Sequence, residues 1–85
     1  MSEEEKPTIK RTVTIWGGNN VYIRKVWAEL VRQGYKASYS KALNVLIYIG
    51  IMSIQILNKL PLEDEEKLAQ TVVNVYKDMF DELGD

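Results

Sequence analysis

The chain contains no cysteine and no histidine among its 85 residues. Without cysteine there can be no disulfide, thiolate zinc site or cysteine nucleophile, and without histidine the commonest general base and metal ligand is missing. The carboxylates form no separated pair in a setting recognisable for acid and base catalysis. We therefore expect no enzymatic activity, no catalytic residues, no metal site and no cofactor.

The chain also lacks a long hydrophobic run and an N-terminal signal. Residues 2–6, "SEEEK", are acidic and polar, unlike a secretory leader. The longest apolar stretch, residues 42–57, is shorter than the roughly 20 apolar residues that a membrane span needs. It is interrupted by Asn44, Gly50, Ser53 and Gln55. The expected location is the cytoplasm, or the host cytoplasm if a virus or plasmid encodes the protein, with no membrane partner.

A net charge of −1 hides a strong separation of charge along the chain. Residues 6–60 contain nine lysines and arginines and one acidic residue, for a net charge of +8. Residues 61–85 contain two lysines and eight acidic residues, for a net charge of −6. A basic body suits a polyanion such as nucleic acid, and an acidic tail restricts where that polyanion binds.

A second β-strand is also missing. Residues 1–7 are expected to form a flexible leader, and residues 9–16 then follow a period of two that predicts a strand. One side of this strand carries Lys10, Thr12 and Thr14, and the other carries Ile9, Val13 and Ile15. Because no other segment is a convincing strand, its backbone partner is expected to come from a second chain.

Three helices are predicted to follow the strand. Gly17 and Gly18 are expected to form a turn that is free to take positive φ. The first helix covers about residues 20–33, with Asn19 or Asn20 as its N-cap and Gly34 as its stop. The second covers about residues 40–59, with Ser40 as the preferred N-cap and Ser38 as the alternative. The third covers residues 62–83 and begins with the acidic run "EDEE", which complements the helix dipole.

The second helix is apolar on nearly every side, which one small chain could not cover. Two chains that pair their strands antiparallel and share a helical core would solve both problems. The order of "KRTVTIW", "NNVYIRKVWAELVRQG" and "YSKALNVLI" resembles the ribbon-helix-helix DNA-binding proteins, the family of the Arc and Met repressors. The predicted fold class is therefore mostly α with one short strand, as a ribbon-helix-helix homodimer over residues 8–60, with an additional C-terminal helix that packs on the dimer.

The resemblance implies a mechanism in which a two-stranded ribbon enters the major groove of double-stranded DNA. It implies base contacts from the polar side of the strand, namely Lys10, Thr12 and Thr14. It also implies that the N-terminus of the second helix binds a phosphate. The expected phosphate contacts are Arg11, Lys36, Tyr39, Ser40 and Lys41.

The predicted function is sequence-specific DNA binding by a homodimeric transcriptional regulator, which is expected to be a repressor. Assembly of higher order on DNA stays open at this point. Two alternatives remain open at this point. The protein could be an antitoxin-type regulator whose residues 62–83 bind a toxin partner, or a protein-interaction module that dimerises without binding DNA. The apolar stripe of the third helix predicts that this helix packs on something, either the dimer core or a second protein.

Overall fold

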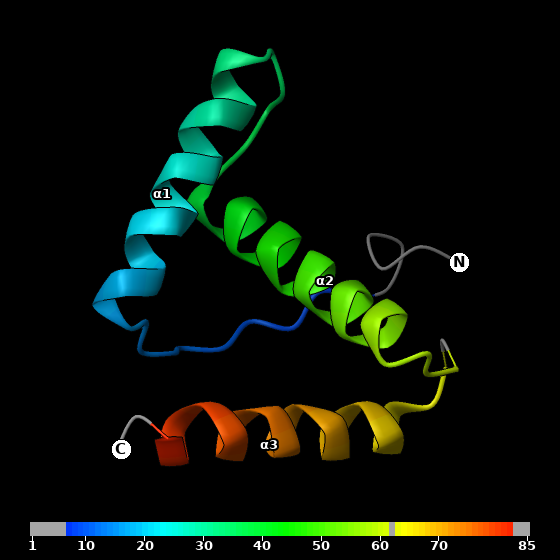
Figure 1. Ribbon diagram of the computed structural model, residues 1–85. Coiled ribbons are helices and arrows are strands. Elements are labelled where there is room, and N and C mark those ends of the chain that lie inside the picture. Colours follow the sequence, from blue (N-terminus) through cyan, green and yellow to red (C-terminus); the bar gives the residue numbers. More distant parts are fainter. Residues whose placement is uncertain (1–6, 62, 83–85) are drawn as a thin grey trace.

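The computed structural model describes residues 7–61 and 63–82 and contains three helices in this part of the chain. They are α1 (Gly17–Arg32), α2 (Tyr39–Leu57) and α3 (Glu65–Glu82). Helices α1 and α2 contact each other, as do α2 and α3. Figure 1 shows the N-terminal end of α2 beside the middle of α1, with α3 running back below α2 from the C-terminal end of that helix. The molecule is therefore open, with α2 as its central element.

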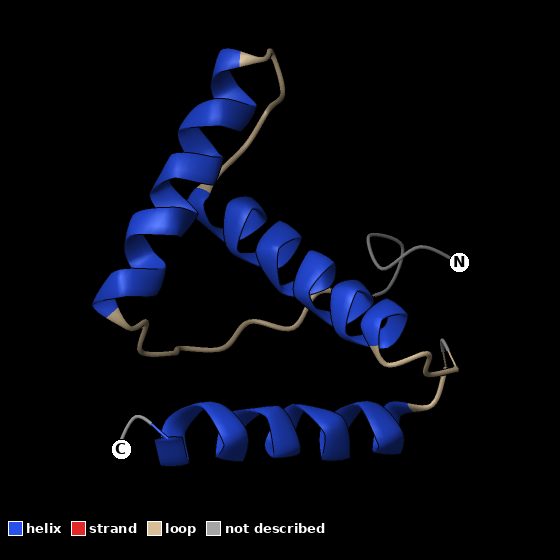
Figure 2. Cartoon of the chain, in the orientation of Figure 1, coloured by secondary structure: helices blue, strands red, loops and turns tan. Residues whose placement is uncertain are grey.

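The predicted strand is absent from the described residues, so the predicted fold class is wrong. Residues 7–16 form an open segment before α1, and Figure 2 shows only helix and loop across the described ranges. A β-strand requires a ladder of backbone hydrogen bonds to a neighbouring strand, and the described part of this chain offers none. Alternation of polar and apolar residues therefore did not suffice to make residues 9–16 a strand.

The start of α1 also differs from the prediction. The helix begins at Gly17, so Gly17 and Gly18 lie in its first turn and do not form a turn of positive φ. Trp16 is the N-cap, with extended backbone angles and no capping hydrogen bond from its side chain. The backbone amide of Asn20 already donates to the Trp16 carbonyl, at 2.9 Å. The predicted caps, Asn19 and Asn20, are therefore inside the helix.

Helix α1 ends in a Schellman motif, in which the backbone amides of the two residues after the cap donate to carbonyls of the last helical turn. The amide of Gly34 donates to Val31 and that of Tyr35 donates to Leu30, each at 3.0 Å. Gly34 has φ +93°, the left-handed conformation that glycine adopts without a Cβ clash. The expectation that Gly34 stops this helix is confirmed.

Helix α2 ends in the same motif with a different residue at the left-handed position. Lys59 has φ 53°, its amide donates to Ile56 at 3.3 Å, and the amide of Leu60 donates to Gln55 at 2.9 Å. For a residue with a Cβ this conformation costs roughly 1–2 kcal/mol. Helix α2 therefore ends at Leu57, two residues before the predicted boundary, at a strained position.

Helices α2 and α3 both begin at a side-chain cap. Ser38 caps α2, because its Oγ accepts the Lys41 amide at 3.1 Å. The preferred cap, Ser40, is therefore wrong and the alternative is correct. Asp64 caps α3, since its Oδ1 accepts the Lys67 amide at 2.9 Å. This cap explains why α3 begins at Glu65 and not at the predicted residue 62. Residue 62 lies outside the described residues, and so do residues 83–85 and the expected flexible leader up to residue 6.

The core of the single chain is very small. Among the described residues, only Ile23, Ala42 and Gln55 are buried. The chain exposes 7711 Å², whereas a folded monomer of 9.8 kDa is expected to expose about 5,200 Å². The radius of gyration is 14.8 Å, compared with about 12 Å for a compact domain of this length. One copy therefore leaves much of its apolar surface in contact with water.

Candidate nucleic-acid interface

The predicted base-contacting residues lie together on the open segment that precedes α1. Lys10, Thr12 and Thr14 are all exposed there, and so is Arg11. Ile9 and Val13, on the nominally apolar side, are also exposed. The lysine, arginine and threonine side chains of this segment are therefore accessible to a ligand, whereas Ile15 is half-buried.

The end of the open segment meets both of the first two helices. A shallow hollow is lined by Thr14, Ile15 and Trp16 from the segment, by Asn19 and Ile23 from α1, and by Leu43 from α2. Thr14 therefore lies beside the helix pair. Ile23, the most buried residue of α1, holds this junction together.

The N-terminus of α2 combines backbone donors with positive charge. The first amides of a helix have no intrahelical acceptor, and here the Lys41 amide is already taken by Ser38. The amides of Tyr39 and Ser40 precede the first intrahelical hydrogen bond, which joins Ala42 to the Ser38 carbonyl. Lys36 and Lys41 stand on either side of them in the sequence and are exposed. This arrangement suits an anion, which the helix dipole also favours.

Tyr39 has a structural role that the sequence analysis did not identify. Its hydroxyl donates to Asn20 Oδ1 at 2.5 Å in a half-buried position. Its ring meets Trp27 edge to face, with 6.2 Å between the ring centroids, and Trp27 Nε1 donates to the Ala37 carbonyl at 3.2 Å. These contacts hold the start of α2 against α1. Since the Tyr39 proton is committed to Asn20, the hydroxyl is not positioned as a donor to a phosphate.

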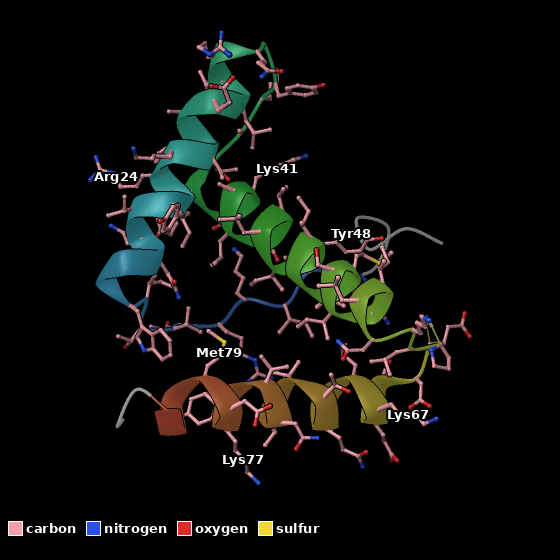
Figure 3. The ribbon with its side chains drawn as sticks, viewed as in Figure 1. Arg24, Lys41, Tyr48, Lys67, Lys77 and Met79 are labelled. Atoms are coloured by element: carbon pink, nitrogen blue, oxygen red, sulfur yellow. The ribbon has the colours of Figure 1, made fainter. Side chains whose placement is uncertain are left out.

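The structure does not bring all the predicted contact residues to one place. In Figure 3, Lys41 projects from the N-terminal end of α2, away from the open segment that carries Lys10. Arg24 projects outward from α1 in the same view. Within one chain, the expected base contacts lie on the open segment with Arg11, and the other expected phosphate contacts lie at or just before the start of α2.

One basic residue of α1 is neutralised within the helix. Arg32 forms an ion pair with Glu29, and its Nε donates to Glu29 Oε1 at 3.1 Å. The Arg32 guanidinium, followed by the Gln33 amide, holds the pKa of the Glu29 carboxyl below its usual value. Glu29 is the only acidic residue in residues 7–60, so that part of the chain keeps a strong excess of positive charge.

The acidic junction before α3 does not form a metal site. Pro61, Glu63, Asp64, Glu65 and Glu66 line a shallow depression. Across residues 7–61 and 63–82, no group of three or more acidic, histidine or cysteine side chains is arranged to hold a metal ion. Asp64 is instead used as the cap of α3.

Helix α2 is long and apolar enough to cross a membrane, judged only by its length and composition. The core helix of a soluble protein passes the same test, so this is weak evidence for a membrane span. Only 11% of an 18-residue stretch of α2 is buried within the single chain. The helix therefore needs a further apolar environment, which a membrane or another protein chain could supply.

The chain matches no family model, no curated protein and no solved structure. The resemblance to the ribbon-helix-helix proteins therefore depends on the sequence patterns alone.

Proposed function

We propose that the protein is a homodimeric regulator of transcription that binds double-stranded DNA. The separation of charge carries this proposal: residues 6–60 have a net charge of +8, and residues 61–85 have a net charge of −6. Phosphate contacts supply most of the affinity of proteins for DNA. The acidic region repels the same phosphates, which favours an orientation with the basic part of the chain against the DNA.

Two regions would make the contacts. The amides of Tyr39 and Ser40, with Lys36 and Lys41 beside them, fit a phosphate of the DNA backbone. The open segment supplies Lys10, Thr12 and Thr14, whose side chains are exposed. Lysine donates to guanine acceptors, and threonine combines a hydroxyl that bonds to base edges with a methyl that contacts thymine. Phosphate contacts would position the protein, and the open segment would select the sequence.

A dimer would double both regions. Most soluble oligomers are symmetric, and dimeric DNA-binding proteins bind pairs of half-sites. The surface that one chain leaves exposed, described above, supports association of two copies. The proposed regulator is expected to recognise a palindromic or repeated site.

The test is a footprint and a binding titration on the DNA upstream of the protein's own gene. Replacement of Lys10, Thr12 and Thr14 by alanine should abolish the footprint but leave weak binding to random DNA. The matched control replaces Lys67 and Lys77 by alanine on the acidic helix, where Figure 3 shows both pointing away from the rest of the chain. A triple variant that keeps the wild-type footprint would refute the role of the open segment.

The salt dependence of binding tests the second region separately. Each phosphate contact contributes about 0.9 to the slope of log affinity against log salt concentration. Replacing Lys36 and Lys41 by alanine removes two contacts from each chain, so the slope for a dimer should fall by about 3.6. An unchanged slope would show that these lysines do not contact DNA.

One alternative function is also supported by an observation. The large apolar surface of α2 and α3 would serve equally well in a protein-interaction module that does not bind DNA. This module should show no affinity for DNA at physiological salt and no effect of Lys10→Ala on its association. The footprint described above distinguishes the two functions.

A further inference from the structure

Helix α3 has an apolar face that is wider than the surface that α2 covers. Its half-buried residues are Leu68 and Thr71. The exposed fraction is 39% at Val75, 42% at Val72 and 49% at Val73, and it reaches 54% at Met79, which lies further along the helix on the same side as Leu68. An amphipathic helix buries its apolar face in the folded state. In the single chain, a large part of this face is uncovered.

Helix α2 leaves apolar side chains uncovered as well. Ile47, Ile49 and Ile51 are exposed near its middle, and Ile56 and Leu57 are exposed at its C-terminal end. These positions lie on several sides of the helix. Helix α2 contacts α3, and each of the two helices leaves apolar side chains uncovered.

The amount of exposed surface suits a second copy of the chain. The 7711 Å² that the chain exposes exceeds the expectation for a monomer of its mass by about 2,500 Å². Obligate homodimers bury roughly 2,000–5,000 Å² in total and have apolar interfaces. Two copies that each bury half of this excess would form an interface of about 2,500 Å², which lies within that range.

We infer that the apolar face of α3, centred on Val72 and Met79, docks on a second copy of the chain together with the uncovered side of α2. This inference rests on the homodimer of the proposed function and adds α3 to its interface. In a two-fold dimer each chain supplies the same surface, so the apolar faces of both chains are covered at once. The opposite side of α3 carries Gln70, Asn74 and Asp78, which are exposed and polar, so it stays in water.

The docked position also explains the placement of charge. Helix α3 belongs to the acidic region of the chain. Packed against the dimer core by its apolar face, it leaves its polar side, with Asp78, in water. The net negative charge of this region repels DNA. This leaves the basic region formed by α1, the start of α2 and the open segment as the surface that is favourable for a polyanion.

The absence of cysteine from the chain allows a direct test with single thiols. Met79→Cys places a thiol on the apolar face of α3, and Asn74→Cys places a matched thiol on its polar face. The rate of alkylation is measured in the full chain, in native buffer, at low and high micromolar concentrations. Mass action populates the dimer at the higher concentration, so the Met79→Cys thiol should react at least about fivefold more slowly there. The Asn74→Cys thiol should react at the same rate at both concentrations.

Sedimentation and circular dichroism on the same samples give the oligomeric state and the helix content. If Met79→Cys reacts at the same rate at both concentrations while the protein goes from monomer to dimer, α3 lies outside the interface and the inference is overturned. A chain that stays monomeric at the higher concentration also overturns it. The alkylation is repeated with phosphatidylcholine vesicles, and a Met79→Cys thiol that is protected only when these vesicles are added overturns the inference as well. Protection that persists in a protein with no DNA affinity would support the inference and refute only the proposed DNA binding.

Discussion

The hydrogen bond between Tyr39 and Asn20 provides a quantitative test of how α1 and α2 are held together. Tyr39→Phe removes the hydroxyl but keeps the ring that packs edge to face on Trp27. A typical intramolecular hydrogen bond contributes about 0.5–1.5 kcal/mol net, and this one is half-buried and leaves Asn20 Oδ1 without its donor. We expect a loss of about 1 kcal/mol in the free energy of unfolding.

A loss of this size should lower the melting temperature by about 4–8 °C in a domain of 60–100 residues. Thermal unfolding is followed by circular dichroism at a fixed protein concentration, because association makes the melting temperature depend on concentration. Tyr22→Phe is the matched control, since Tyr22 lies on α1 with 67% of its surface exposed and should change stability by less than about 0.5 kcal/mol.

A double-mutant cycle with Asn20→Ala isolates the contact itself. The coupling energy should be about 1 kcal/mol, and a coupling below about 0.3 kcal/mol would refute the assigned link between the helices. The same variant tests the original prediction that Tyr39 contacts phosphate. Because its hydroxyl is committed to Asn20, Tyr39→Phe should leave the salt dependence of DNA binding unchanged while the protein is folded.

Three further predictions concern the helix ends, and each is measured by urea denaturation at fixed protein concentration. Ser38→Ala should lose about 1 kcal/mol because it removes the cap of α2, whereas Ser40→Ala should have little effect; equal losses would contradict the assigned cap. Gly18→Ala should stabilise the protein by about 0.5 kcal/mol, because the position is helical with open space around it, and a clear loss would show that it needs positive φ. Lys59→Gly should stabilise by about 1 kcal/mol and Gly34→Ala should destabilise by a similar amount, because both positions have positive φ; the opposite signs would exclude the left-handed conformations.

Helix positions were predictable from local patterns, but helix starts were not. Gly34 is recognisable as a stop because few other residues adopt its conformation easily. The stop at Lys59 is hidden, since nothing about a lysine predicts a left-handed residue. The cap of α2 could not be chosen from the sequence, because two serines were available. Serines 38 and 40 have the same chemistry, so the choice between them depends on where the chain turns away from α1.

In the candidate site, too, some features can be predicted from the sequence and others depend on tertiary structure. The sequence identifies the basic and threonine side chains of residues 10–14, but the strand that their spacing predicted is absent, and Ile9 and Val13 are exposed as well. The engagement of Tyr39 with Asn20 does not, because the two residues are 19 positions apart and meet only when α2 packs across α1.

By itself, the sequence determined the features that depend on residue type and near neighbours: the charge separation, the absence of histidine and cysteine, the apolar periodicities and the glycine stop. Tertiary structure decided whether residues 9–16 form a strand, because a strand exists only through hydrogen bonds to a neighbour that periodicity cannot supply. It also decided the role of Tyr39, since that depends on a contact between two helices. How much of α2 and α3 stays exposed is likewise a tertiary property, because burial depends on what packs against each helix.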